Sequence, residues 1–398
     1  MSWLNRAQQH EQACIKFMRD LIHIPSESGQ EGGVAARIKE EMERLNFDRA
    51  WIDDYGNVIG KIGNGPTRLL FDSHIDTVGI GNLDQWEFDP YEGKLEDGYI
   101  YGRGACDNHN GTVPQVFGAA LLKESKEILD QFTIYVVGTV QEEDCDGLAL
   151  RYILEESVGP VDFICLGEAT DLKIYRGHRG RMEIEVATTG VSCHGSAPSR
   201  GKNAIYRMGQ LVGEIEQLNE RLLVDDFLGK GTCAVTYIEC DTPSLCAVPD
   251  GCRIHVDRRL TRGEDKELAV KEIMELPSFN SDYMSIKIKS YDTPSYTGKV
   301  LETEKYYPTW TLSLEHQLVQ AGVKAASAVD GKTPEVSRWV FSTNGVSSMG
   351  QLNIPTIGYG PGREEESHSI MDRIKIADMV YATAFYAALP EALLEKKA

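Results

Sequence analysis

The chain has 398 residues, and its 41 Lys and Arg against 61 Asp and Glu give a formal net charge of −20. Such an acidic protein is poorly suited to duplex DNA or anionic lipid, because both bind surfaces rich in Lys and Arg. Hydrophobic residues make up 41% of the sequence and charged residues 26%, which excludes a disordered or fibrous chain. We therefore expect a globular protein of about two or three domains, with neither nucleic acid nor a membrane as partner.

The sequence predicts a cytoplasmic protein. Its first residues lack the apolar stretch of a signal peptide, and no run of about 18 apolar residues occurs. The nine cysteines contain no C-x-x-C pair, which favours reduced thiols. Cys240, Cys246 and Cys252 recur every six residues, and we interpret them as small apolar side chains on strands rather than metal ligands.

Four short apolar runs predict buried strands at residues 68–71, 132–140, 161–166 and 354–359. Between the first two, apolar residues recur at helical spacing over 113–121. Strands that alternate with helices indicate an α/β sheet with covered faces.

A second pattern begins near Gly177. It predicts a strand around 182–186, a helix at 203–222, strands at 232–239 and 253–260, a helix at 266–274 and a strand at 283–288. This β-α-β-β-α-β order is ferredoxin-like. We therefore predict a small α+β domain of residues 177–293, inserted into an α/β domain formed by residues 1–176 and 294–398.

Acidic and imidazole side chains follow the predicted α/β strands. They are His74 and Asp76 after the first strand, Asp107 after a glycine-rich turn, Glu142 and Glu143 after the second strand, Glu168 after the third, and His368 in a loop after the fourth. Functional groups of open α/β sheets gather at the carboxyl ends of strands. Any one of these residues is weak evidence, but their coincidence predicts one functional site.

Two imidazoles and three carboxylates suit Zn²⁺, Co²⁺ or Mn²⁺, with one carboxylate bridging two ions about 3.5–4 Å apart. The carboxylates would repel one another without such ions. Asp76 can orient His74 through its second ring nitrogen. Of Glu142 and Glu143, one can bind metal while the other takes a proton from water. We therefore predict metal-assisted hydrolysis, with an ion-binding patch that lacks catalysis as the alternative.

Other residues near these positions support rival interpretations. Cys106, Cys145 and Cys193 each lie near a proposed site residue, so a cysteine nucleophile paired with His194 is possible chemistry. That interpretation leaves the metal-ligand set unexplained. His109, two residues after Asp107, faces either the substrate or the interior of its loop.

Several stretches resemble the superfamily of zinc-dependent aminoacylases, carboxypeptidases and acetylornithine/succinyl-diaminopimelate deacylases. The matching stretches are DSHIDT (72–77), WEFDPY (86–91), GRGACD (102–107), QEE (141–143), GE (167–168), HGSAP (194–198) and GPG (360–362) followed by His368. The sequence is most similar to a subgroup of hydrolases linked to selenium metabolism. The resemblance implies a dizinc peptidase-type catalytic domain with an inserted ferredoxin-like α+β lid through which two chains form a homodimer.

The resemblance also implies a role for each residue. His74 and Glu168 would bind one zinc, Glu143 and His368 the other, and Asp107 both, with Glu142 as general base, Asp76 orienting His74, and His194 reaching the substrate carbonyl of a neighbouring subunit. Asn203, Arg258, Asn344 and Gly362 would bind substrate. The chain departs from the family pattern at 108–111 (NHNG) and 342–345 (STNG), which we expect to line the substrate pocket.

The predicted reaction is hydrolysis of the amide bond of an N-acyl amino acid, with an acetyl, succinyl or carbamoyl-type acyl group. A di- or tripeptidase or a carboxypeptidase-type exopeptidase is the alternative within hydrolases. A zinc-binding regulator without catalysis is the alternative outside them, although the retained Glu142 argues against it. The sequence identifies neither the acyl group, nor the substrate side chain, nor the native metal.

Overall fold

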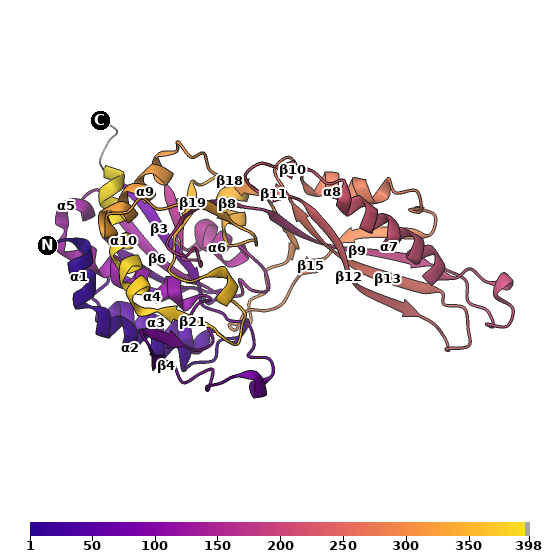
Figure 1. Cartoon of the computed structure of the whole chain (residues 1–398), viewed down its shortest axis with the longest axis horizontal. Helices are drawn as coiled ribbons and strands as arrows, with labels where there is room; N and C mark the ends of the chain where they lie inside the picture. Colours follow the sequence, from indigo (N-terminus) through magenta and orange to yellow (C-terminus); the bar gives the residue numbers. More distant parts are fainter. Residues whose placement is uncertain (395–398) are drawn as a thin grey trace.

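The structure is a computed structural model that describes residues 1–394, so the last four residues of the predicted catalytic domain lie outside the described part. A larger α/β unit holds both described chain ends, and a narrower unit projects from it (Figure 1). Each unit has its own sheet and its own cluster of buried apolar side chains. The predicted fold class is confirmed. Among the described residues, no helix has the length and apolar character needed to cross a membrane.

The large sheet has the order β1-β2-β6-β3-β7-β20-β8-β18, with β19 beside β8. Its strands are β1 (Arg49–Ile52), β2 (Val58–Ile62), β3 (Thr67–His74), β6 (Phe132–Thr139), β7 (Phe163–Leu166), β8 (Ile174–His178), β18 (Trp310–Thr311), β19 (Val336–Trp339) and β20 (Thr356–Gly358). The central strands β6, β3, β7 and β20 are parallel. All residues of β6 are buried, as expected for a parallel strand covered on both faces.

Helices surround this sheet. They are α1 (Trp3–Gln9), α2 (Glu11–Ile22), α3 (Gly32–Arg44), α4 (His109–Leu121), α5 (Lys126–Leu129), α6 (Leu148–Tyr152), α9 (Gln317–Asp330) and α10 (Ile376–Leu394). The predicted helix at 113–121 is α4, which contacts β3, β6, α2 and α10. Nearly every residue of α4 is buried. The helix, and with it the residues just before its first turn, is therefore held firmly against the sheet.

The narrower unit, which we call the lid, contains β9 (Gly180–Thr189), α7 (Ala204–Glu220), β12 (Thr232–Asp241), β13 (Gly251–Leu260), α8 (Lys266–Met274) and β14 (Met284–Ile288). Its sheet order is β12-β13-β9-β14, and all three pairings are antiparallel. This is the predicted ferredoxin-like arrangement. Alternate residues of β9 and β13 are buried, because one face of the sheet packs on the two helices while the other lacks such a cover.

Short strands complete the chain. They are β4 (Lys94–Glu96), β5 (Tyr99–Tyr101), β10 (Val224–Asp225), β11 (Gly229–Lys230), β15 (Ser290–Tyr291), β16 (Thr303–Glu304), β17 (Tyr306–Tyr307) and β21 (Arg373–Lys375). The pairing of β21 with β5 matters most for the site, because it joins the segment before Asp107 to the segment after His368.

Candidate active site

The parallel strands deliver the predicted ligands to one edge of the sheet. His74 is the last residue of β3, and β3 pairs in parallel with β6 and β7. The residues just after β6 include Glu142 and Glu143, and Glu168 follows β7. Asp107 lies two residues before the start of α4. Since neighbouring parallel strands end side by side, residues far apart in the sequence meet here.

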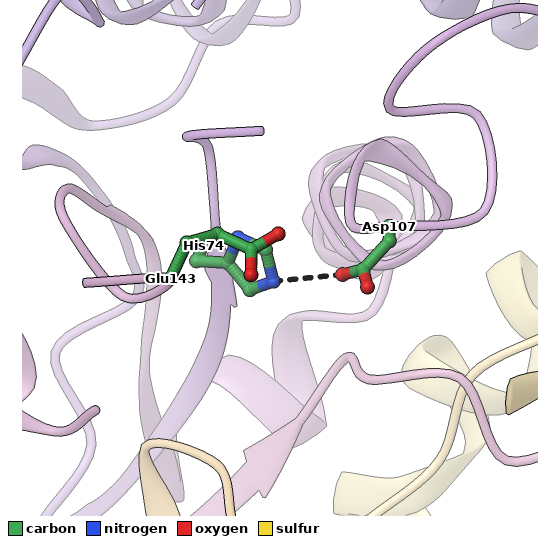
Figure 2. A group of neighbouring side chains, drawn as sticks. All are labelled: His74, Asp107 and Glu143. Atoms are coloured by element: carbon green, nitrogen blue, oxygen red, sulfur yellow. Dashed lines mark hydrogen bonds and ion pairs between the residues drawn. The ribbon is translucent and has the colours of Figure 1, made fainter. Parts of the chain in front are cut away.

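The two carboxylate oxygens of Asp107 face two different imidazoles. Oδ1 lies 2.9 Å from His74 Nε2, and that nitrogen is also 3.7 Å from Glu168 Oε1. Oδ2 lies 3.3 Å from His368 Nε2, which is 3.0 Å from Glu143 Oε1. Figure 2 shows His74, Asp107 and Glu143 pointing toward one another from separate segments. Asp107 thus stands between two imidazole–carboxylate pairs, as a bridging ligand would.

Asp76 organises both His74 and the turn that carries the two glutamates. Its backbone carbonyl lies 3.0 Å from His74 Nδ1, and its carboxylate Oδ1 lies 3.4 Å from the same nitrogen. The carboxylate also accepts hydrogen bonds from the backbone N–H groups of Glu142 and Glu143, each at 3.1 Å, and from the Ser28 hydroxyl at 2.6 Å. One buried side chain therefore fixes a ligand and the turn beside it.

A cavity of about 290 Å³ opens over this cluster. It is lined by His74, Asp107, Glu142, Glu143, Asp146, Glu168, Arg181, Arg259, Phe341, Ser342, Glu364, Ser367 and His368. Arg181 and Arg259 were not among the predicted site residues. They come from β9 and β13 and are direct cross-strand partners. Arg181 pairs with Asp146 at 3.0 Å, and Arg259 with Asp257 at 2.7 Å. The cavity thus has an acidic floor and two guanidinium groups on the lid side.

Burial determines the protonation of the carboxyl groups that form the floor of the cavity. It raises the pKa of Glu168 to about 8, the pKa of Glu142 well above its usual range, and the pKa of Glu143. Hydrogen bonds to Asp107 and Glu143 raise the pKa of His368 to about 10. Without added cations, these carboxylates and imidazoles share protons, because a buried cluster of negative charges is costly.

The same residues fit divalent ions. His74, Asp107 and Glu143 each offer a ligand atom, and these atoms lie within 4.8 Å of one another. Nitrogen and carboxylate donors of this kind suit Zn²⁺ and related ions. The positive charge of the ions would take the place of the shared protons.

Several predicted substrate-binding residues have structural partners within the chain. Asn203 caps α7 by accepting hydrogen bonds from two backbone N–H groups. Asn344 donates to Asp72 at 2.9 Å and accepts from the Gly147 backbone at 2.7 Å. A Cβ atom at Gly362 would lie 2.2 Å from the side-chain amide nitrogen of Asn110, so the glycine allows the Asn110 side chain to pack closely here.

Arg258 lies on the helix-covered face of the lid sheet. It is fully buried and pairs with Glu264 at 2.7 Å and Glu272 at 3.1 Å. Its neighbour Arg259 points to the opposite face, as alternate residues of a strand do, and lines the cavity. Strand alternation is the sequence signal that separates these two arginines.

His194 lies in an exposed lid loop, outside the group that lines the cavity. The Ser196 hydroxyl lies 2.7 Å from its Nδ1. The lid strand β9 runs from Arg181, at the cavity, to Thr189. At about 3.3 Å per residue, its far end is roughly 26 Å away. Within one chain, His194 therefore lies far from the predicted metal ligands.

The rival residues have little support. Burial raises the pKa of Cys106 well above its usual range and the pKa of Cys145 to about 12, which disfavours thiolates. His109 is buried, and burial together with the charge of His74 lowers its pKa to about 3. From the departing segments, Ser342 lines the cavity, while residues 108–111 lie buried outside its lining.

A carboxylate shared by two imidazole–carboxylate pairs, at the strand ends of an α/β unit with an inserted lid, defines a metallohydrolase. The chain belongs to peptidase family M20/M25/M40, whose model matches residues 70–392. The predicted resemblance is thereby confirmed, and the protein is a metal-dependent hydrolase of this family.

Relatives share the sequence over nearly its whole length, and solved structures share the fold. The chain is 48% identical to the uncharacterized protein YgeY of Escherichia coli strain K12, over 97% of this chain and 96% of YgeY. It is 30% identical to a "probable succinyl-diaminopimelate desuccinylase" of Staphylococcus aureus strain MSSA476, over 97% and 99% of the two chains. The fold is similar to that of aminopeptidase PepT from Bacillus cereus, with a TM-score of 0.74, 20% identity and coverage of 97% and 99%.

A second solved structure shares the fold. It is the YxeP protein of Bacillus subtilis, described as a dinuclear metal-binding peptidase of the M20 family, with a TM-score of 0.73 and 17% identity. The match covers 98% of this chain and 99% of that one.

The protonation of the floor predicts how the stability of metal-free protein depends on pH. The raised pKa of Glu168 means that folding is disfavoured increasingly as pH rises from 4.5 to about 8. The raised pKa of His368 contributes stability that is complete below 6.5 and is lost as pH rises toward about 10. Both effects lower the melting temperature of chelator-treated protein between pH 5.5 and 8.5.

Bound divalent ions would replace those protons, so the difference in melting temperature between zinc-loaded and chelator-treated protein should widen as pH rises. Thermal unfolding of both forms across this pH range measures the difference. A difference that stays constant or narrows would contradict the account.

Proposed function

We propose that the protein hydrolyses the amide bond of an N-acyl amino acid with a free carboxylate, using two bound Zn²⁺ ions. One observation carries this proposal: a single cavity contains a carboxylate-bridged ligand cluster, the further carboxylate of Glu142 and two arginines. The Staphylococcus relative is named a probable succinyl-diaminopimelate desuccinylase, and a desuccinylase is a deacylase, which supports this proposal.

His74 and Glu168 would hold one ion and Glu143 and His368 the other, with Asp107 between them. When bound, two divalent ions supply the positive charge that polarises a carbonyl group and lowers the pKa of water. Glu142 has its carboxylate 4.0 Å from His74 Nε2 and faces the cavity. It would accept a proton from the attacking water at its carboxylate and deliver that proton to the leaving nitrogen.

The two arginines would hold the carboxylate of the substrate. Arg181 and Arg259 lie opposite each other on adjacent strands, so both guanidinium groups border the same cavity. Each already has one carboxylate partner, Asp146 or Asp257, which limits its motion. A planar guanidinium pairs well with a substrate carboxylate, since the two groups match in geometry.

A dipeptidase is the second candidate, and Glu364 favours it. Its Oε1 is buried without a hydrogen-bond partner, and the residue lines the cavity. The α-ammonium group of a dipeptide would satisfy that oxygen, whereas an N-acyl group would leave it unpaired.

A substrate screen separates the two candidates. N-acetyl, N-succinyl and N-carbamoyl amino acids are compared with dipeptides, each with zinc or cobalt present. We expect metal-dependent release of the amino acid from N-acyl substrates, and release about 10- to 100-fold slower from their carboxamide analogues. Preference for dipeptides would favour the second candidate, and absence of any metal-dependent hydrolysis would contradict both.

The substitution Glu142→Gln tests the base. The variant keeps all five predicted metal ligands, so it should bind metal as the wild type does while kcat falls by about 10²–10⁴-fold. Elemental analysis and steady-state kinetics measure the two effects. Glu143→Gln is the matched control, and it should lose metal. If Glu142→Gln loses metal instead, the roles of the two glutamates are exchanged.

The adjacent arginines provide a paired test of substrate recognition. Arg259→Met should lower kcat/KM for substrates with a carboxylate by about 10- to 100-fold, the value of one or two hydrogen bonds to a charged group. Activity on carboxamide analogues should change little. Arg258→Met should lower the melting temperature, because it leaves Glu264 buried without its partner. Equal selectivity of the two variants would contradict the assignment of Arg259.

We also propose a homodimer through the lid, in which His194 acts on the substrate bound to the other subunit. The edge strand β12 and the helix α7 carry exposed apolar side chains, Tyr237, Ile238 and Tyr206. A two-fold contact through this face would bring each lid toward the other subunit. His194 would then donate a hydrogen bond to the carbonyl oxygen as negative charge develops.

Mixed dimers test this arrangement. His194→Ala keeps the metal site and Glu142→Ala keeps the lid loop, so each variant alone should have very low activity. Random exchange gives one complete site in about half of the dimers, which restores about a quarter of the wild-type activity. If subunits exchange and no activity returns, His194 does not act across the interface.

A further inference from the structure

We propose that Asp372 is a positioning residue that clamps the loop of Asp107 to the loop of His368 and so sets the spacing of the metal ligands. The proposal rests on the metal site proposed above. Asp372 lies outside the cavity, and no interaction with substrate is required of it.

The clamp consists of four hydrogen bonds to one short turn. Asp372 Oδ2 accepts from Arg103 Nη1 at 3.0 Å and from the Gly104 backbone at 2.8 Å. Its Oδ1 accepts from the Cys106 backbone at 2.6 Å, and its own carbonyl accepts from the Gly102 backbone at 3.0 Å. Asp372 is fully buried, so these bonds have no competition from water.

Arg103 is enclosed from the other side. Its backbone donates to the Pro90 carbonyl at 2.8 Å, and its guanidinium lies 5.1 Å from the centre of the Trp86 ring. The Trp86 indole N–H is itself fixed by a hydrogen bond to the Ile80 carbonyl at 2.9 Å. Removing one partner of such a sealed ion pair leaves the other as an uncompensated buried charge. The turn itself requires glycine at Gly104, where φ is +86°.

Both ends of the clamp lead directly to predicted ligands. Asp107 follows Cys106, and His368 lies four residues before Asp372. The pairing of Arg373 with Tyr101, between β21 and β5, holds the same two segments in register. The Asp107 carboxylate reaches His368 at 3.3 Å only while these loops keep their spacing.

The His368 side of the cluster depends most on the clamp. The His368 side chain is 52% exposed, whereas the His74 side chain is 2% exposed and is also held by Asp76. His368 has a φ of +57°, a conformation that non-glycine residues adopt only when the surrounding structure imposes it. A change at Asp372 should therefore weaken the Glu143–His368 ion more than the His74–Glu168 ion.

Calorimetric titration of chelator-stripped protein with Zn²⁺ tests the proposal without using activity. Asp372→Asn keeps the shape of the side chain. One carboxylate oxygen becomes an amide NH₂ group, which then faces an N–H donor of the turn instead of accepting from it. We expect one of the two binding steps, which we assign to the Glu143–His368 ion, to lose about 10- to 100-fold in affinity, the usual effect of changing a residue behind a ligand. The other step should change less.

The control is Glu264→Gln, which disrupts the buried Arg258–Glu264 pair of the lid. It should lower the melting temperature of metal-free protein while both zinc affinities stay within about twofold of the wild type, because the hydrogen-bond and ion-pair partners of Glu264 are Arg258 and Thr261 and include no predicted metal ligand. Wild-type affinities in Asp372→Asn would overturn the proposal. So would an equal loss of zinc affinity in Glu264→Gln, since that would indicate general destabilisation.

Arg103→Lys provides a second variant if Asp372→Asn does not fold. It keeps the charge but loses the guanidinium fork, and it should weaken the same step. Unchanged affinities in a folded Arg103→Lys would overturn the clamp. A wild-type protein that binds no zinc would instead overturn the metal site itself, and the clamp with it.

Discussion

The structure depends on one electrostatic constraint: several carboxylates are buried within a few ångströms of one another. Asp107, Glu142, Glu143 and Glu168 line the same cavity, with His74 and His368 as their neighbouring bases. In a medium of low polarity such a cluster is stable only with shared protons or bound cations. The loops around the cluster therefore have to hold these carboxylates in place against their mutual repulsion. Buried hydrogen bonds within and between the loops do this.

Two buried aspartates perform that task at two different turns. Asp76 fixes His74 and the turn of Glu142 and Glu143, and Asp372 fixes the turn that leads to Asp107. The glutamate turn is tied to the lid connections as well. Arg181 of β9 pairs with Asp146, and the hydroxyl of Tyr307 in β17 donates to Cys145. The position of the lid is thus linked physically to the turn that bears Glu142, the proposed base.

The sequence predicted the fold and the ligand cluster because both follow from local patterns. Apolar runs marked the central parallel strands, and the residues after them met at one edge. The lid order was predicted for the same reason. Arg258 and Arg259 differ by one position, so only the register of β13 decides which one faces the cavity. Arg181 and Asp372 act through partners far away in sequence, and no local sequence pattern predicts such contacts.

Anomalous diffraction at the zinc edge, from crystals of zinc-loaded protein, tests the central claim most directly. The account predicts two peaks per chain about 3.5–4 Å apart, one on each side of the Asp107 carboxylate. His74 and Glu168 should contact one ion, and Glu143 and His368 the other. A single peak, or two peaks that Asp107 does not bridge, would contradict the account.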